Sequence, residues 1–213
     1  MDFKILADQY RNELLDNVLP FWLEHSQDLE FGGYFTCLDR KGGVFDTDKF
    51  IWLQGREVWM FSMLYNKVEK RQEWLDCAVQ GGEFLKKCGH NGDYNWYFSL
   101  DRSGRPLVEP YNIFSYTFAT MAFGQLSLAT GSQEYADIAK KTFEIILSKV
   151  DNPKGKWNKV HPGTRNLKNF ALPMILCNLA LEIEHLLDPG YLEQTMETVS
   201  YTHLRAHETE ADL

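Results

Sequence analysis

Arg56 is the residue best placed for chemistry in this sequence, because it follows Trp52 by one helical turn. Trp59 and Met60 come three and four residues later, so a helix would surround the guanidinium with aromatic and apolar side chains. A buried arginine needs a polar ligand or a carboxylate partner. Its fixed fork of donors suits sugar oxygens or a developing oxyanion, and a salt bridge to another helix is the alternative.

Aromatic residues make up 14% of the chain, and several cluster near the predicted ends of helices. Aromatic rings at such positions offer apolar faces on which a sugar ring can stack, although most aromatic residues at helical spacing belong to a core. Tyr111 and Asn112 follow Glu109 and Pro110 at a predicted helix entrance. We therefore expect Trp52, Tyr111 and Asn112 to face a pocket.

A basic loop lies at residues 151–159, where Lys154, Lys156 and Lys159 stand around Gly155. This composition can contact phosphate groups. The loop lacks the Gly-Lys-Ser/Thr arrangement of a Walker motif, so a solvated surface loop is the alternative.

Metal and redox chemistry are not predicted. The histidines form no catalytic set, and His203 and His207 have helical spacing without the glutamate of a zinc protease. The cysteines are scattered without a CxxC pair, which favours reduced thiols of a cytoplasmic protein over a disulfide framework or a zinc site. They are Cys37, Cys77, Cys88 and Cys177.

Composition limits the function classes further. With 44% hydrophobic and 24% charged residues among 213, the chain can bury a globular core. The net charge of -8 contains no basic block, which argues against nucleic acid or an anionic membrane as the partner. No apolar stretch approaches the roughly 20 residues that span a bilayer, and no leader segment is recognised. A small, neutral or weakly charged ligand fits better.

Helical periodicity dominates the chain and predicts an all-α fold. The segments with this spacing are Phe3 to His25, Trp52 to Val68, Gln72 to Cys88, Asn112 to Thr130, Gln133 to Val150 and Phe170 to Leu187. Glycine, serine and proline at the breaks agree with these boundaries.

Two connections look like short aromatic strands closed by a glycine turn, at residues 33–42 and 96–104. They share one pattern, in which two aromatic residues precede Cys or Ser, Leu, Asp, Arg and, after one further residue, Gly. Recurrence after about sixty residues indicates repeated helical hairpins, and chance similarity of two turns is the alternative. The apolar second, fourth and sixth helices favour a closed toroid, with the third and fifth outside.

The run Val44 to Arg56 resembles the N-terminal signature of the N-acylglucosamine 2-epimerase family. Further resemblance lies in residues 32–35, 109–125 and 162–176, and it covers about residues 5 to 198. The resemblance implies an (α/α)6 barrel that holds an opened sugar for proton exchange at C2. One base removes the proton, donors hold the enediolate, and a second group returns a proton to the other face.

The resemblance also implies roles for particular residues. Arg56 is the carried-over catalytic donor near O1 and O2 of the substrate, and Tyr111 and Asn169 are candidates for the pocket wall. Pro173 stands where related cellobiose epimerases and mannose isomerases place a histidine four residues after the asparagine, so an acylated hexosamine is the favoured substrate. No cofactor is required. ATP is implied as an allosteric modulator, with its phosphates at Lys154, Lys156 and Lys159, and the family implies a homodimer.

In the family the two bases are histidines of the second half of the barrel. Residues 1–198 therefore resemble the N-terminal half of a single barrel, and we expect this half to be inactive alone and to leave an apolar inner face open to water. Residues 199–213 leave the family pattern and resemble translated adaptor sequence, with a short polar helix as the alternative.

The sequence is also compatible with other functions. An aldose-ketose isomerase or a cellobiose or mannose 2-epimerase would use the same barrel. A hydrolase would need two carboxylates at the pocket, for which Asp101 and Glu109 are available. A non-catalytic interaction protein is a fourth possibility, since relatives are also described as renin-binding proteins.

Overall fold

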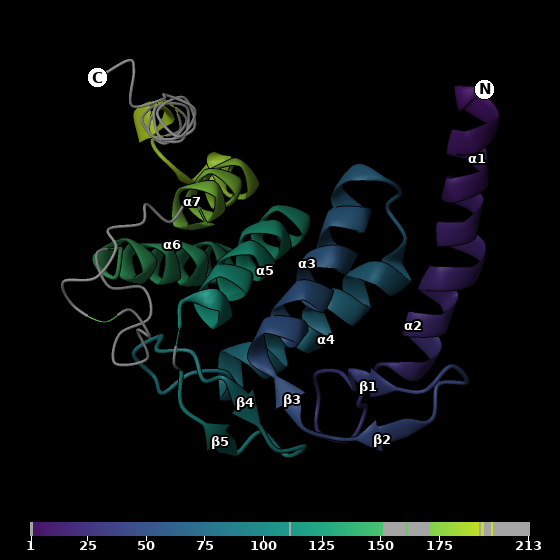
Figure 1. Cartoon of the computed structure of the whole chain (residues 1–213), viewed down its shortest axis with the longest axis horizontal. Helices are drawn as coiled ribbons and strands as arrows, with labels where there is room; N and C mark the ends of the chain where they lie inside the picture. Colours follow the sequence, from purple (N-terminus) through teal and green to yellow (C-terminus); the bar gives the residue numbers. More distant parts are fainter. Residues whose placement is uncertain are drawn as a thin grey trace.

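The computed structural model is mainly helical and describes residues 2–110, 112–150, 161, 171–191, 193 and 197. All six predicted helical segments are confirmed (Figure 1). The helices are α1 (Phe3–Glu13), α2 (Leu19–His25), α3 (Ile51–Lys67), α4 (Gln72–Cys88), α5 (Phe114–Thr130), α6 (Gln133–Ser148) and α7 (Ala171–Glu182), the last followed by a 3-10 turn (Glu184–Leu186). The expected foreign segment 199–213 lies outside the described residues.

The first predicted helix is not uniform. A π-helical stretch, Leu14–Val18, joins α1 to α2. Pro20, in the first turn of α2, has no backbone N–H, so the regular ladder of hydrogen bonds is interrupted at this point.

The helices form two layers. Helices α3, α5 and α7 lie side by side, while α4 packs behind α3 and α6 behind α5 (Figure 1). Most of α5 between Ser115 and Ser127 is buried, as expected for a helix with neighbours on several sides. Buried side chains of α4 and α6 recur at helical spacing, as in helices with one face toward a core. The predicted division into inner and outer helices is confirmed.

The ends of the row of helices present apolar surface. Helix α1 has no buried residue, and its Phe3, Ile5 and Tyr10 are exposed to 77%, 67% and 69%. At the other end, Met174 and Leu181 of α7 are also exposed. Exposed apolar side chains therefore lie at both ends of the row.

Two β-hairpins carry the predicted internal repeat. In their turns, Asp39 and Asp101 each accept a hydrogen bond from a backbone N–H group four residues later. Gly42 and Gly104 adopt φ angles of 82° and 92°, which glycine permits without steric cost. The shared residues therefore encode the same turn twice. The strands are β1 (Cys37–Leu38) paired with β2 (Val44–Asp46), and β4 (Ser99–Leu100) paired with β5 (Pro106–Val108).

Both hairpins are fastened to the helices in the same way. Tyr34 and Trp96, the first aromatic residue of each repeat, are fully buried. The Tyr34 hydroxyl donates to the carbonyl oxygen of Cys77 on α4 at 2.7 Å. The Trp96 indole donates to Oγ1 of Thr142 on α6 at 3.1 Å. Because each aromatic residue holds its hairpin to the next outer helix, the repeat is structural and not a chance similarity of two turns.

A buried ion cluster fixes the start of α3. Strand β3 (Lys49–Phe50) pairs with β4 and leads directly into this helix. The fully buried Lys49 ammonium group donates to Oδ2 of Asp28 and to the carbonyl oxygen of Arg102, both at 2.9 Å. The Arg102 guanidinium also donates to Asp28. Burial opposes ionisation of Asp28, but the hydrogen bonds from Arg102 and Lys49 outweigh it and lower the pKa of this carboxyl.

Lys49→Met tests the importance of this cluster. We expect the free energy of unfolding to fall by about 3–5 kcal/mol, because the Asp28 carboxylate stays buried with one cation fewer. As a control, Lys86→Met removes the surface ion pairs with Glu83 and Glu134 and should cost about 1 kcal/mol or less. Urea unfolding followed by tryptophan fluorescence measures both variants. Equal losses would contradict the role assigned to the buried cluster.

Candidate functional site

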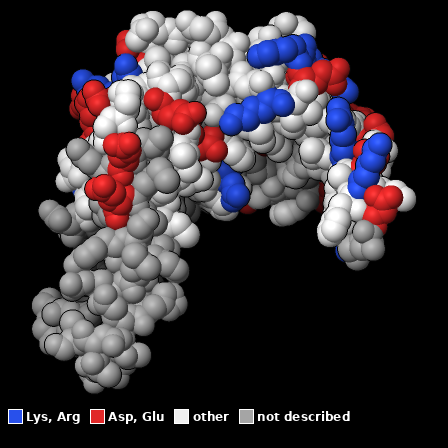
Figure 2. Space-filling model, turned by 90° about the horizontal axis from the view of Figure 1, so that it is seen from above, with Lys and Arg blue, Asp and Glu red and all other residues white. Residues whose placement is uncertain are grey.

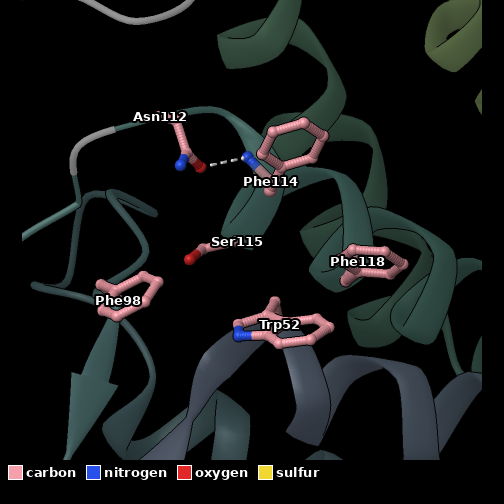
Figure 3. Close-up of a pocket in the computed structure, with 6 residues that line it drawn as sticks. All are labelled: Trp52, Phe98, Asn112, Phe114, Ser115 and Phe118. Atoms are coloured by element: carbon pink, nitrogen blue, oxygen red, sulfur yellow. Dashed lines mark hydrogen bonds between the residues drawn. The ribbon is translucent and has the colours of Figure 1, made fainter. Parts of the chain in front are cut away.

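A pocket of about 390 Å³ opens where the first turns of α3 and α5 meet the second hairpin (Figure 3). Cavities of this size suit small molecules. Trp52 comes from α3, Phe98 precedes β4, and the remaining side chains come from α5 or the residues before it. The lining residues are Trp52, Phe98, Asn112, Phe114, Ser115 and Phe118.

The pocket depends on a close approach of the two inner helices. A Cβ atom at Gly55 of α3 would lie 2.9 Å from the carbonyl carbon and oxygen of Phe118 on α5, so only glycine fits at this contact. The rings of Trp52 and Phe118 consequently lie close together, with centroids 6.2 Å apart and planes tilted by 48°. One wall of the pocket is therefore set by backbone packing.

The other wall is held by the β-sheet. The Ile51 N–H donates to the carbonyl oxygen of Phe98 at 3.0 Å, and the Phe98 N–H donates to Val108 at 2.9 Å. The Phe98 ring also packs edge-on against Phe50, with ring centroids 5.7 Å apart. Phe98 is thus fixed relative to the start of α3.

Arg56 lies beside the pocket, with its guanidinium carbon 5.1 Å from the ring centre of Phe118 and 6.0 Å from that of Trp52. The Arg56 side chain is exposed. The sequence-based expectation that this arginine is buried is therefore wrong. Arg56 forms no ion pair with the residues that the structure describes, so the alternative of a salt bridge between helices is not supported there. The donor fork is held against two aromatic rings.

Asn112 occupies the entrance of α5 as predicted. Its Oδ1 accepts a hydrogen bond from the Phe114 N–H at 2.9 Å, which satisfies one free donor of the first helical turn (Figure 3). The structure thus brings Trp52 and Asn112 into one pocket, with Arg56 at its edge. The other predicted site residues lie outside the described part of the chain: Tyr111, Asn169, Lys154, Lys156 and Lys159.

Four lining residues were not predicted as site residues: Phe98, Phe114, Ser115 and Phe118. Ser115 and Phe118 follow Asn112 at offsets of three and six, so extending the pattern from the helix entrance could have indicated them. The position of Phe98 depends on sheet pairing and has no comparable signal. Tyr116, which follows Ser115 directly, is buried, and its hydroxyl accepts a hydrogen bond from Lys149 at 2.8 Å.

The two carboxylates considered for a hydrolase do not line the pocket. The Asp101 carboxylate accepts hydrogen bonds from the Arg105 backbone, the Ser103 hydroxyl and the Arg105 guanidinium, which hold its pKa well below the usual range. The Asp101 carboxylate therefore stabilises its own hairpin turn. Glu109 is exposed.

The described part of the chain was predicted to lack a metal site and a disulfide framework. It contains no cluster of three His, Cys, Asp or Glu side chains that could hold a metal ion, and all four cysteines are free thiols. None of its helices is long and apolar enough to cross a bilayer. On the face shown in Figure 2, basic side chains are interspersed with acidic ones.

Glu57 follows Arg56 but does not line the pocket. It is 8% exposed, and its Oε1 has no hydrogen-bond partner among the described residues. Burial raises the pKa of this carboxyl to about 8, although the Ser26 hydroxyl partly offsets the shift. Glu57 is therefore protonated at neutral pH, in the layer between α3 and Cys77 of α4.

The chain matches the model of one protein family, described as N-acylglucosamine 2-epimerase, over residues 33–212. It is 41% identical over 182 residues to the N-acylglucosamine 2-epimerase of Bos taurus, covering 79% of this chain and 41% of that protein. It is 28% identical over 168 residues to the cellobiose 2-epimerase of Dictyoglomus turgidum, covering 74% of this chain and 42% of that protein. The chain thus spans about two-fifths of the length of these relatives.

A solved structure shares the fold. The cellobiose 2-epimerase of Spirochaeta thermophila superposes with a TM-score of 0.76 at 20% sequence identity, covering 92% of this chain and 52% of that one. The helical layers described above are therefore those of an (α/α)6 barrel, and the predicted fold class is confirmed.

Glu57→Gln tests the buried carboxyl. Between pH 4.5 and about 8 the folded state keeps a proton that the unfolded chain releases, so stability falls as pH rises through this window. Glutamine does not titrate, so the variant should lose less stability than the parent between about pH 5 and 8. Glu144→Gln, at an exposed position of α6, should keep the parent's pH profile. Urea unfolding across pH provides the comparison, and identical slopes for both variants would refute the assignment.

Proposed function

Because the chain belongs to the N-acylglucosamine 2-epimerase family, we propose that it forms part of an enzyme that interconverts N-acylglucosamine and N-acylmannosamine. The observation that carries this proposal is the aromatic pocket at the inner helix ends with Arg56 at its edge. A cavity of about 390 Å³ accommodates a single sugar residue, and its ring walls suit the apolar faces of a sugar.

Arg56 has the chemistry for the charged step of this reaction. When the proton at C2 of the open-chain sugar is removed, negative charge develops on O1. A guanidinium provides several directed N–H donors and retains its charge, so it can stabilise this oxyanion without a change of protonation. The Phe118 and Trp52 rings hold the guanidinium at the pocket edge and limit its freedom before the reaction.

The bases are proposed to lie elsewhere in the protein. No histidine, aspartate or glutamate lines the pocket that the described residues form. Epimerisation needs one group to remove the C2 proton and another to deliver a proton to the opposite face. Since the chain spans about two-fifths of its relatives' length, we propose that the remaining part supplies both groups.

Two further parts of the proposal rest on the family resemblance alone. ATP is proposed as an allosteric modulator, with Lys154, Lys156 and Lys159 as candidates for contacts to its phosphates. A homodimer is proposed for the longer protein. No cofactor is proposed for the reaction itself.

Solvent proton exchange tests the reaction. We expect N-acetylmannosamine in deuterated water, with ATP present, to gain deuterium at C2 with a chimera in which residues 1–198 are joined to the remaining part of the Bos taurus relative. The 213-residue chain alone should give none. Nuclear magnetic resonance of the sugar measures the label. Exchange by the chain alone would contradict the placement of the bases, and a ketose product would favour an aldose-ketose isomerase.

Arg56→Met in the chimera tests the role of the guanidinium. We expect kcat to fall by about 10²–10³, as for removal of a donor to a developing oxyanion. Arg56→Lys should recover only part of this loss, because lysine keeps the charge without the fork. Arg40→Met, an exposed arginine of the first hairpin turn, is the control and should retain the parent's kcat. A kcat unchanged by Arg56→Met would remove Arg56 from the mechanism.

A further inference from the structure

Ser115 carries a hydroxyl that has no hydrogen-bond partner in the described part of the chain. The residue is only 2% exposed, it lines the pocket, and its oxygen points into the cavity (Figure 3). The structure gives this hydroxyl no hydrogen bond to any described residue. The other side-chain hydroxyls at Ser or Thr on α5 each donate to a carbonyl oxygen of their own helix, at Thr117, Thr120, Ser127 and Thr130.

Unlike the other Ser and Thr hydroxyls of α5, the Ser115 hydroxyl is available to a ligand. In the open pocket this hydroxyl can bond to water, and an acceptor atom of a ligand can replace that water. Ser115 is the second residue of α5, so the carbonyl groups three and four residues before it precede the helix, and the bond that the later hydroxyls form is not available to it in the same way. Its orientation toward the cavity therefore points to a ligand atom as its partner.

Two N–H donors face the same space. The Oδ1 atom of Asn112 is occupied by the Phe114 N–H, which directs Nδ2 of the amide away from the helix. The indole nitrogen of Trp52 lies on the side of its ring that faces Phe98 and Ser115 (Figure 3). Neither nitrogen has a hydrogen-bond partner among the described residues. The three groups supply up to four donors, whereas their acceptors are the Ser115 oxygen and the remaining lone pair of Asn112 Oδ1, so donors outnumber acceptors.

This set of groups selects for a hydrogen-bond acceptor next to an apolar group. A carbonyl oxygen accepts two hydrogen bonds and needs no acceptor in return, whereas each sugar hydroxyl also brings a donor that requires one. The surrounding rings of Phe98 and Phe114 suit a methyl group. No ionised side chain lines the pocket, and Arg56 at its edge disfavours a free ammonium group.

We infer that this pocket binds the acylamino substituent of the sugar, with the Ser115 hydroxyl donating to the acyl carbonyl oxygen and the acyl methyl group against the aromatic wall. This inference rests on the proposed function and specifies which part of the substrate the described pocket selects. Ser115 thus distinguishes an N-acyl sugar from one with a hydroxyl or an amine at C2.

Ligand binding to the 213-residue chain tests the inference, because Ser115, Asn112 and Trp52 all belong to it. Saturation-transfer difference nuclear magnetic resonance would compare N-acetylglucosamine with glucose. We expect the acetyl methyl protons to receive more saturation than the ring protons, and N-acetylglucosamine to bind more tightly than glucose. Ser115→Ala should weaken N-acetylglucosamine binding by about five- to tenfold and leave glucose binding unchanged.

Ser127→Ala is the matched control. It removes a buried hydroxyl from the same helix, but that hydroxyl bonds to Gly124 and lies away from the pocket. Its affinities for both sugars should equal those of the parent. Thermal melting of all three proteins identifies any loss of folding, and the saturation pattern of the parent chain stays informative if Ser115→Ala does not fold.

The outcomes separate this inference from the proposed function. If N-acetylglucosamine binds equally well to the parent and to Ser115→Ala, or if its ring protons receive the most saturation, the acyl assignment is wrong and the epimerase proposal stands. If the parent chain binds neither sugar, the inference fails, and proton exchange with the chimera decides separately whether the epimerase proposal stands.

Discussion

The buried pair of Lys49 and Asp28 is the interaction on which the site depends. Both side chains are fully buried, so their charges are removed from water at considerable cost and must satisfy each other. Asp28 accepts hydrogen bonds from Lys49, from the Arg102 guanidinium and from two backbone N–H groups of its own turn. One carboxylate therefore joins the connection after α2, the strand before α3 and the second hairpin, three segments that are distant in sequence.

The pocket follows from this junction. Lys49 lies two residues before the start of α3. The hydrogen bonds of its ammonium group therefore also fix the position of the first turn of this helix, which carries Trp52. The same strand pairs with β4 and thereby holds Phe98 opposite Trp52. Gly55 then lets α5 approach closely enough for Phe118 to complete the wall. The aromatic pocket is thus a product of one ion cluster, one sheet and one close helix contact.

Internal repetition explains how the fold achieves this geometry. Each hairpin turns at an aspartate and a glycine and is anchored by an aromatic side chain to an outer helix, α4 for the first hairpin and α6 for the second. The inner helix after each hairpin begins at the same end of the barrel (Figure 1). Functional side chains near the starts of inner helices therefore converge, although no single repeat contains a complete site.

The sequence by itself determined the local structure. Apolar spacing predicted all six helical segments, and the shared aspartate and glycine predicted both turns, because these features depend on residues close together in the chain. It also indicated Arg56, Trp52 and Asn112 through their place on helices. Only the tertiary structure decided that Lys49 is buried, that Arg56 is exposed, and that Phe98 and Ser115 belong to the pocket. Each of these depends on contacts between segments far apart in sequence, and periodicity within one segment carries no information about such contacts.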